Sequence, residues 1–545
     1  MSDDVFSQFK EHSVAEFFRK NKQMLGFSGK VRSLTTIVHE LVTNSLDAAE
    51  EGRILPNITV ELTEVDKDEG RYIVRVEDNG TGIPERLIGK ALGMMLAGTK
   101  FHRYVQQRGQ QGIGAAGVTM YAQLTTGKPV KVVSGYKGTK IKCEVSIDIK
   151  TNRPIVNVIE REPTDWHGLI YEAEVKDVKY DKSSYGVYEY LKRTALANPH
   201  AEIVFIDPSG ERHVFPRSVE EIPPKPKPVK PHPLGVTTSD LIEFAHYSKE
   251  PTLGSFLRNT FSRLSQKKLE EIKEQLPDIN FRMKPRELTW EQADRLVNVF
   301  KKIKWISPSA DGIYPIGAEQ IKKSIYNILN PEFCEVVERS PKVYKGGVPF
   351  IVEVGLAYGG DAGKKIGNSR VSDVMRFANR APLLFDAGGC AITESAKSID
   401  WKRYGIQRFD EAPITLIVNV SSVHIPYTGA GKQALASEQE IVDEIRNAIM
   451  EAARKLQVHI RGKVRERERA TKIKSVLRYV KQLTADLTEL AEFPDREFLN
   501  NQLITLVETK YGKRRPNTEN EMNGTEKSGT EKNAGDIPSG EGAKS

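Results

Sequence analysis

Cysteine and long apolar runs are both scarce in this chain. Only three of its 545 residues are cysteines, Cys143, Cys334 and Cys390, and they lack the paired spacing of a zinc site or a disulfide framework. Such usage is typical of a reducing compartment, so we expect a cytoplasmic protein. No window approaches the ~20 apolar residues of a membrane span, and the acidic N-terminus lacks the apolar core of a secretory signal. We therefore expect no membrane partner.

A strong excess of either charge is also missing. The 81 Lys and Arg residues against 73 Asp and Glu give a formal net charge of +8, which permits contact with nucleic acid without demonstrating it. The contents of 39 % apolar and 28 % charged residues are ordinary for a globular protein. The length exceeds what one hydrophobic core supports, so we expect about three domains of ~100–200 residues.

A proline-rich segment marks the clearest predicted domain boundary. The alternating prolines of residues 222–235, IPPKPKPVKPHPLG, predict an extended and semi-rigid linker. Before it, residues 1–221 alternate helical and strand patterns, and the strands arrive in hairpin-like pairs. This pattern predicts an α/β (α+β) sandwich around one mixed or antiparallel sheet. After the linker, residues 236–306 carry helical signals and almost no strand signal.

The C-terminal half returns to an α/β pattern. Residues 307–484 contain the strand-like runs PFIVEVGLAY, APLLFDA and PITLIVNVSSVHIP and end in a long helix from about Ser437 to Thr484. One face of that helix is apolar and its middle is highly charged, so we expect it to project from its domain or to pack on a partner. A further helical segment is expected over residues 485–511. Residues 512–545 have almost no aliphatic side chains, which predicts disorder.

The helix predicted from Leu34 to Ala49 has one acidic edge. At 100° per residue, Glu40, Asn44 and Asp47 fall within one ~60° arc, and apolar residues cover the half-circle beside it. A solvated polar face is the ordinary explanation for such a pattern in a single helix. Two later segments favour a functional explanation.

The first of these segments is the strand RYIVRVED, residues 71–78. Strand alternation puts Asp78 on the same face as Tyr72, Val74 and Val76, so an apolar face ends in a carboxylate. An unpaired buried carboxylate is costly, so Asp78 must find a donor, of which the exocyclic amine of adenine is one candidate, or carry a proton. Alternatively, residues 78–82 form a turn that closes a hairpin. The two interpretations are compatible, because a glycine turn also admits a flat base.

The second segment is rich in glycine. Gly109, Gly112, Gly114 and Gly117 run into an apolar helical stretch, and they offer backbone N–H groups and a helix N-terminus to an anion. The last three match the dinucleotide fingerprint GxGxxG, but no strand precedes them and no acid stands about twenty residues after them. A GxxxxGK[ST] phosphate loop is absent from the sequence. A nucleotide would therefore have to bind in another way.

Together, Glu-x-x-x-Asn-x-x-Asp, Asp-x-Gly-x-Gly and the glycine-rich segment resemble the three motifs of the GHKL ATPases, the superfamily of gyrase-type topoisomerases, MutL, heat-shock-90 chaperones and histidine kinases. The resemblance implies a GHKL (Bergerat) sandwich with ATP and Mg²⁺ as cofactors. It implies that Glu40 is the general base, that Asn44 is the Mg²⁺ ligand and that Asp78 accepts from the adenine amine. Gly82 would let the base sit close. The other implied nucleotide contacts are Asp47, Thr99, Lys100, Arg108, Gly109, Gln110, Gln111, Gly112, Ile113, Gly114 and Ala115.

The order of the domains indicates which branch of the GHKL superfamily the chain resembles. No phospho-acceptor helix precedes the first domain, which disfavours a histidine kinase. The stretches IPPKPKPVKPHPLG, PSADGIYPIG, FANRAPLLFD, IDWKRYGIQ and PYTGAGKQALA resemble the archaeal-like B-subunit family of the type IIB topoisomerases, and the likeness covers most of residues 10–490. It implies that residues 236–306 are a helix–two-turns–helix domain and that residues 307–484 are a transducer domain.

The resemblance bears on two further positions, Lys432 and Leu169. An isolated loop lysine such as Lys432, in TGAGK, is ordinarily a surface charge, but the resemblance implies that it reaches the γ-phosphate from the transducer and couples nucleotide state to domain rotation. The stretch Trp166-His167-Gly168-Leu169 departs from the family, because a threonine that commonly supports the adenine-binding aspartate is missing. Water or another hydroxyl, such as Thr125 or Thr126, would take its place.

The resemblance also implies partners. Two copies would dimerise on binding ATP and capture double-stranded DNA, with a swapped N-terminal arm anchored by Phe6, Phe9, Phe17 and Phe18. The long helix would hold a DNA-cleaving A subunit in an A2B2 heterotetramer that passes one duplex through another, relaxing supercoils and decatenating DNA. The chain has no DxD-type cleavage cluster, so strand scission falls to that partner. The alternatives are a MutL-like or chaperone-like ATPase clamp and a non-catalytic DNA-binding scaffold.

Overall fold

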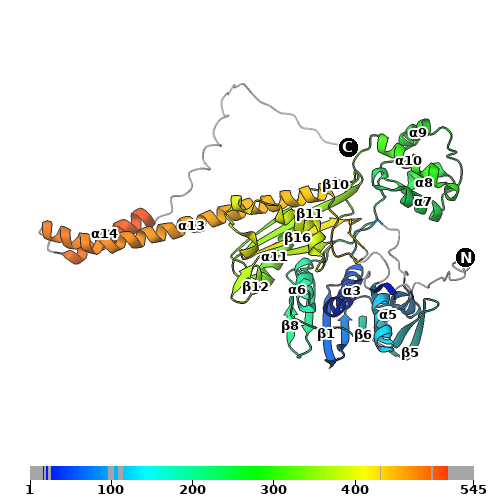
Figure 1. Ribbon diagram of the computed structural model, residues 1–545, viewed down its shortest axis with the longest axis horizontal. Coiled ribbons are helices and arrows are strands. Elements are labelled where there is room, and N and C mark those ends of the chain that lie inside the picture. Colours follow the sequence, from blue (N-terminus) through cyan, green and yellow to red (C-terminus); the bar gives the residue numbers. More distant parts are fainter. Residues whose placement is uncertain are drawn as a thin grey trace, which may run out of the picture. The chain divides into compact units, whose positions relative to one another are not determined.

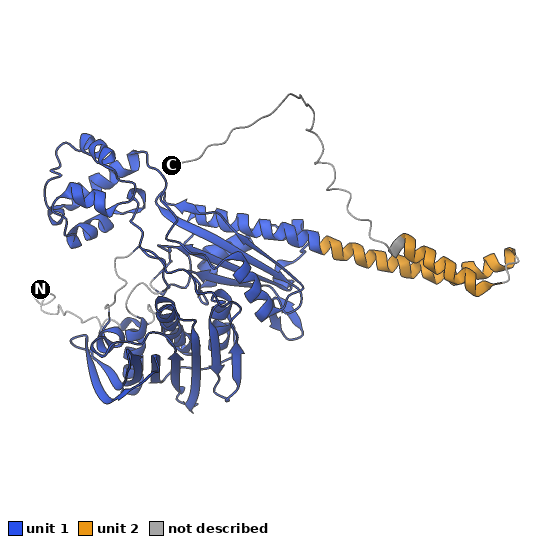
Figure 2. Cartoon of the chain, turned by 180° about the vertical axis from the view of Figure 1, so that it is seen from behind, with its two compact units in different colours: residues 1–459 blue, residues 460–545 orange. Residues whose placement is uncertain are grey.

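The computed structural model (Figure 1) describes residues 16, 20–22, 26–95, 104–108, 114–429, 431–491 and 495–512. The predicted N-terminal arm anchors and almost all of the predicted tail lie outside these described residues. The chain divides into two compact units, residues 1–459 and 460–545 (Figure 2). This division falls within the long helix and not at the proline-rich linker, so the predicted domain boundaries stay predictions.

The first sheet has eight strands in the order β5-β4-β3-β6-β2-β1-β7-β8. Neighbouring strands are antiparallel except β1 and β7, which run parallel, so the sheet is mixed, as expected. The strand RYIVRVED, which alternation predicted, is present as β2. Both short strands, β7 and β8, are too brief for a period to emerge. The bounds are β1 Asn57–Asp66, β2 Arg71–Asp78, β3 Val130–Tyr136, β4 Thr139–Asp148, β5 Arg153–Pro163, β6 Gly168–Val175, β7 Glu202–Ile206 and β8 Arg212–Phe215.

Helices share one hydrophobic core with this sheet (Figure 1). They are α3 (Lys30–Glu51), α4 (Glu85–Leu92), α5 (Gly114–Thr126) and α6 (Val187–Ala197). The predicted apolar half of α3, which includes Leu34, Val38, Leu41 and Val42, is buried in that core. Burial alternates along β2 and leaves Tyr72, Val74, Val76 and Asp78 inside, as the sequence predicts. The apolar faces of α3 and β2 therefore belong to one hydrophobic core.

The segment between residues 236 and 303 forms a helical cluster with its own core. Its helices are α7 (Thr238–Tyr247), α8 (Leu253–Thr260), α9 (Gln266–Gln275) and α10 (Trp290–Lys302). Each begins after a hydroxyl residue whose side chain accepts from the first turn, which satisfies a backbone N–H that would otherwise lack a partner. These caps are Thr237, Thr252, Ser265 and Thr289.

The second sheet follows the order β10-β11-β16-β14-β15, and β9 also pairs with β11. Its central strands β11 and β16 are buried along almost their whole length, which explains their nearly continuous apolar sequences. The run APLLFDA was predicted as a strand, but only its first two residues pair, because the chain turns at Asp386 with a positive φ of 57°. The strands are β9 Phe333–Glu338, β10 Lys342–Tyr344, β11 Val348–Tyr358, β14 Asp373–Ala378, β15 Ala381–Pro382 and β16 Ile414–Ser422, with a separate hairpin of β12 Lys364–Ile366 and β13 Ser369–Val371 and with helices α11 Ala318–Leu329 and α12 Ala391–Lys397.

The long helix α13 spans Gln439–Leu490, and α14 spans Arg496–Gly512. The predicted end at Thr484 is wrong by six residues, because the first proline after it is Pro494 and the helix continues until Leu490. The predicted apolar face is buried at Ile441, Ile445, Ala448, Ala452 and Leu456. Among the described helices, none combines the length and the apolar character that crossing a bilayer requires.

Candidate functional site

The acidic edge of α3 runs from exposed to buried positions. Asn44 is exposed, Glu40 is half-buried and Asp47 is buried. The helical periodicity predicts that the three residues share one edge. The segments that pack on that edge decide how exposed each side chain is. Of the three, Glu40 and Asn44 are the more accessible from solvent.

The start of α5 lies against Glu40. A Cβ built on Gly114 would stand 2.1 Å from Oε2 of Glu40, so no other residue fits at this position without displacing the carboxylate. Ala115 follows in the first turn of α5 and is buried. The C-terminal end of the glycine-rich segment thus reaches the carboxylate predicted as a base. The remaining predicted residues of that segment, Thr99, Lys100, Gly109, Gln110, Gln111, Gly112 and Ile113, lie outside the described residues.

Asp78 is a buried carboxylate with three protein donors. The Ser45 hydroxyl donates to Oδ2 at 2.7 Å, and the backbone N–H groups of Gly80 and Leu169 donate to Oδ1 at 2.9 and 3.2 Å. Burial raises the pKa of Asp78, and these three bonds oppose the rise. A carboxylate offers about four acceptor positions, so one remains for a donor from outside the chain. That position suits the exocyclic amine of an adenine.

A hydroxyl takes the place of the missing threonine, as predicted, but it belongs to neither Thr125 nor Thr126. The hydroxyls of Thr125 and Thr126 donate to carbonyls of their own helix, Tyr121 O at 2.8 Å and Ala122 O at 2.7 Å. Ser45 supplies the hydroxyl to Asp78 instead. Leu169 needs no special side chain, because it pairs with Asp78 across β2 and β6 and contributes its backbone N–H. Cross-strand register decides this contact, and no signal in the sequence fixed that register.

Gly82 is required for a reason other than the one predicted. Its φ is +69°, and a Cβ there would lie 2.0 Å from Gly135 O and 3.1 Å from Gly168 O. Any side chain would therefore collide with the backbone of β3. The glycine lets the loop after β2 pack on the sheet, whereas close approach of a base to Gly82 stays a prediction.

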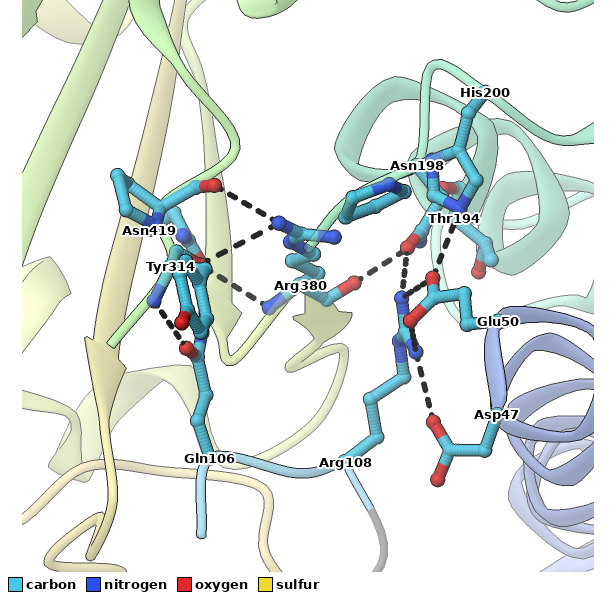
Figure 3. A network of polar contacts seen from close by, with 12 residues as sticks. Asp47, Glu50, Gln106, Arg108, Thr194, Asn198, His200, Tyr314, Arg380 and Asn419 are labelled. Atoms are coloured by element: carbon cyan, nitrogen blue, oxygen red, sulfur yellow. Dashed lines mark hydrogen bonds and ion pairs between the residues drawn. The ribbon is translucent and has the colours of Figure 1, made fainter. Parts of the chain in front are cut away.

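Arg108 lies in a buried ion network with α3 (Figure 3). Its guanidinium donates to Asp47 at 2.7 Å, to Glu50 at 2.6 and 3.0 Å and to Asn198 at 2.5 Å. Burial disfavours the Glu50 carboxylate, but Arg108 and His200 more than compensate and hold the pKa of Glu50 well below its usual range. Asp47 and Arg108 thus bind each other in this conformation, so their predicted contacts to a nucleotide stay predictions.

Sequence reasoning missed the partners in this network. Glu50, Asn198 and His200 come from two segments about 150 residues apart. Glu50 lies three residues after Asp47 on the same helical edge, which is the one signal that could have extended the acidic edge. Nothing in the sequence indicates that a loop arginine pairs with it.

Lys432 acts on the same part of α3. Burial lowers the pKa of His39, Glu40 raises it and the charge of Lys432 lowers it further. The charge of Lys432 therefore acts on His39, the residue before Glu40, although Lys432 belongs to the loop between β16 and α13. Its φ of 50° is left-handed, and its N–H donates to Gly429 O at 3.1 Å, so a tight turn presents the side chain.

Two protein families match the chain. Residues 29–149 match "Histidine kinase-, DNA gyrase B-, and HSP90-like ATPase", and residues 308–472 match "Topoisomerase VI B subunit, transducer". The predicted GHKL fold and transducer domain are confirmed by these matches. The first family also implies that ATP binds.

Relatives matched along most of their length give the same assignment. The B subunit of type 2 DNA topoisomerase 6 from Methanothermobacter thermautotrophicus is 48 % identical over 502 residues, covering 91 % of this chain and 95 % of that one. Its counterpart from Pyrococcus horikoshii is 46 % identical over 553 residues, covering 93 % and 96 %. The solved B subunit of Myxococcus xanthus DNA gyrase, at 12 % identity and a TM-score of 0.39 over 81 % of this chain and 95 % of that one, is too distant to support an argument.

Identity of this extent decides against the alternatives of a MutL-like clamp, a chaperone and a non-catalytic scaffold. The chain belongs to the family of type 2 DNA topoisomerase 6 B subunits, the ATPase subunits of the type IIB topoisomerases.

Proposed function

We propose that the chain binds ATP with Mg²⁺ around α3, the carboxyl end of β2 and the start of α5, and that this binding drives DNA passage with a second subunit. The observation that carries the proposal is the remaining acceptor position on the buried Asp78 carboxylate. Asp78 accepts the adenine amine there. Its three protein donors hold the carboxylate in place before the base arrives, which lowers the entropic cost of recognition.

The phosphate end of the nucleotide lies along the exposed edge of α3. Asn44 holds Mg²⁺ through its amide oxygen, and the ion neutralises charge on the phosphates when it is bound. Glu40 aligns the attacking water and accepts its proton. Lys432 contacts the γ-phosphate from the transducer, which is consistent with its electrostatic influence on His39.

Membership of the family supports the proposed partners. Two B subunits dimerise on ATP, capture a DNA duplex and work with two DNA-cleaving A subunits. We assign the A-subunit contact to residues 460–512, which expose several large apolar side chains that a partner would cover. These are Val464, Tyr479, Leu483, Leu487, Leu490, Phe498 and Leu506.

Asp78→Asn should separate folding from nucleotide binding. The Asn amide oxygen still accepts from Gly80 and Leu169, and its NH₂ donates to the Ser45 hydroxyl, so the fold is kept and no charge is buried. The position meant for the adenine amine now carries a donor, and ATP affinity falls by about tenfold to 100-fold. Titration calorimetry and thermal melting measure the two effects. Unchanged affinity in this variant would remove the assigned base contact.

A non-hydrolysable ATP analogue should dimerise the purified chain. Light scattering is expected to show the mass doubling on addition of the analogue and Mg²⁺, because the bound nucleotide stabilises the state that associates. Asp78→Asn serves as the matched control and stays monomeric at an analogue concentration that dimerises the unmodified chain. A wild-type chain that remains monomeric at saturating analogue would contradict the clamp.

A further inference from the structure

The five residues 104–108 contact elements far from them in the sequence. The carbonyl of Tyr104 accepts from Val229 N in the proline-rich linker at 2.9 Å, and its ring meets Phe244 of α7 edge-on at 6.0 Å. Gln107 O accepts from the Asn379 side chain at 3.2 Å. Arg108 binds α3, as described above. This short segment therefore contacts the linker, the helical cluster, the second sheet and the acidic helix.

Gln106 makes the most specific of these contacts. Its buried amide donates to Tyr314 O at 2.9 Å and accepts from Tyr314 N at 2.6 Å (Figure 3). Both bonds go to one peptide segment, so they fix its direction as well as its distance. The two residues also line one side of a cavity of about 280 Å³ that Arg108 and Arg380 share. Gln106 and Tyr314 thus add discrete polar bonds to a region where α6 also packs on α11 through apolar side chains.

The segment that Gln106 holds leads directly to β16. Arg380 donates to Pro315 O at 2.9 Å, and Glu353 accepts from the N–H groups of Ile316 and Gly317 at 3.0 and 2.7 Å. The Asn419 side chain on β16 donates to Glu353 at 2.8 Å and accepts from Arg380 N at 3.1 Å. The side chains of Glu353, Arg380 and Asn419 are buried, so displacing one leaves another without a partner.

The network closes on α3 as well. Asn198 donates to Arg380 O at 3.1 Å and accepts from Arg108, which binds Asp47 and Glu50 (Figure 3). The loop that carries Lys432 follows β16 directly. A continuous set of buried hydrogen bonds therefore runs from α3, which carries Glu40, to β16, and Lys432 lies in the loop after that strand.

We propose that Gln106 is a positioning residue for ATP hydrolysis, which holds residues 314–317 and β16 so that Lys432 faces Glu40. This inference rests on the roles proposed above for Glu40 and Lys432. Gln106 itself does not touch the nucleotide. Its loss loosens the presentation of Lys432, and a misplacement of about 1 Å at a reacting centre costs up to about 100-fold in rate.

The chain contains a matched control for the two hydrogen bonds that join Gln106 to Tyr314. Gln123 on α5 donates to Ile147 O at 2.9 Å and accepts from Ile147 N at 2.8 Å. It makes the same pair of bonds as Gln106, but both partners lie in the first sheet and its helices. Gln123→Ala and Gln106→Ala therefore remove equivalent hydrogen bonds, and only the second change affects the link to the transducer.

The test compares these two variants of the full chain. For Gln106→Ala we expect kcat for ATP hydrolysis to fall about tenfold with KM within about twofold, because chemistry is affected and nucleotide binding is not. Gln123→Ala should lower the melting temperature as much as Gln106→Ala does, but it should leave both kcat and KM within about twofold of the wild-type values. In a Lys432→Ala background, Gln106→Ala should lower kcat no further, because both changes act through one contact. Equal kcat in the two single variants, or a further loss in the Lys432→Ala background, would overturn the inference.

Hydrogen exchange gives a readout that does not depend on hydrolysis. The Tyr314 amide should exchange faster in Gln106→Ala, and the faster exchange should extend to the loop that carries Lys432, whereas Gln123→Ala should affect only the region of Ile147. Exchange confined to Tyr314 would refute the link to that loop. If Glu40→Ala hydrolyses ATP at full rate, the proposed function fails, and the exchange result still decides whether Gln106 links the two regions.

Discussion

Glu40→Ala should lower kcat for ATP hydrolysis by about 100-fold to 10,000-fold, the range that a positioned general base contributes. Binding of a non-hydrolysable analogue should stay within about twofold, because in the proposed site Asp78 holds the adenine and Asn44 holds the metal without help from Glu40. Phosphate release measures the first quantity and titration calorimetry the second. The physical reason is that the proposed role of Glu40 is to act on the attacking water, whose proton transfer contributes to the transition state and not to ground-state binding.

Two further variants show whether the loss is specific. Glu40→Gln keeps the side-chain volume beside Gly114 but cannot act as a general base, so this variant should be as inactive as Glu40→Ala. Glu51→Ala removes an exposed carboxylate from the end of the same helix and should hydrolyse ATP normally. Undiminished hydrolysis by both Glu40 variants would rule out Glu40 as the base.

Lys432→Ala should be the second large effect. Removing one preorganised donor to developing charge typically costs about 100-fold to 1,000-fold in kcat, and we expect a loss in that range. Lys432→Arg should recover only part of the rate, because a planar guanidinium does not reproduce a compact ammonium. Lys397, an exposed lysine of α12, provides the control, and Lys397→Ala should have wild-type kinetics.

The same substitution has an effect that does not depend on ATP. Burial and the charge of Lys432 both lower the pKa of His39, whereas Glu40 raises it. Removing the Lys432 ammonium removes one lowering influence, so the pKa of His39 should rise in Lys432→Ala. An NMR titration of His39 measures the shift. If the pKa of His39 and the rate of ATP hydrolysis both equal those of the wild-type protein, Lys432 acts neither on His39 nor on hydrolysis.

Periodicity predicted the parts of the site that depend on one element alone. Alternation along β2 placed Asp78 at the end of an apolar face, and the structure buries it there. Helical spacing placed Glu40, Asn44 and Asp47 on one edge. It did not predict that Asp47 is buried against Arg108 while Asn44 is exposed, because those environments come from segments distant in sequence. The same limit explains the error over Thr125 and Thr126: a hydroxyl within a helix is satisfied by the carbonyl four residues before it unless packing directs it elsewhere.

The sequence by itself determined the fold class, the family, the helices α3 and α13 apart from their ends, the helical character of residues 236–303 and the strands β2, β11 and β16. It could do so because backbone periodicity and short motifs are local properties of the chain. Only the tertiary structure decided that Ser45 and the Leu169 N–H support Asp78, that Gly82 makes room for β3, and that Gln106 and Arg108 link α3 to the second sheet. These contacts depend on cross-strand register and on the packing of distant segments. Burial requires each polar group to form a hydrogen bond, and the segments packed beside it supply the partner.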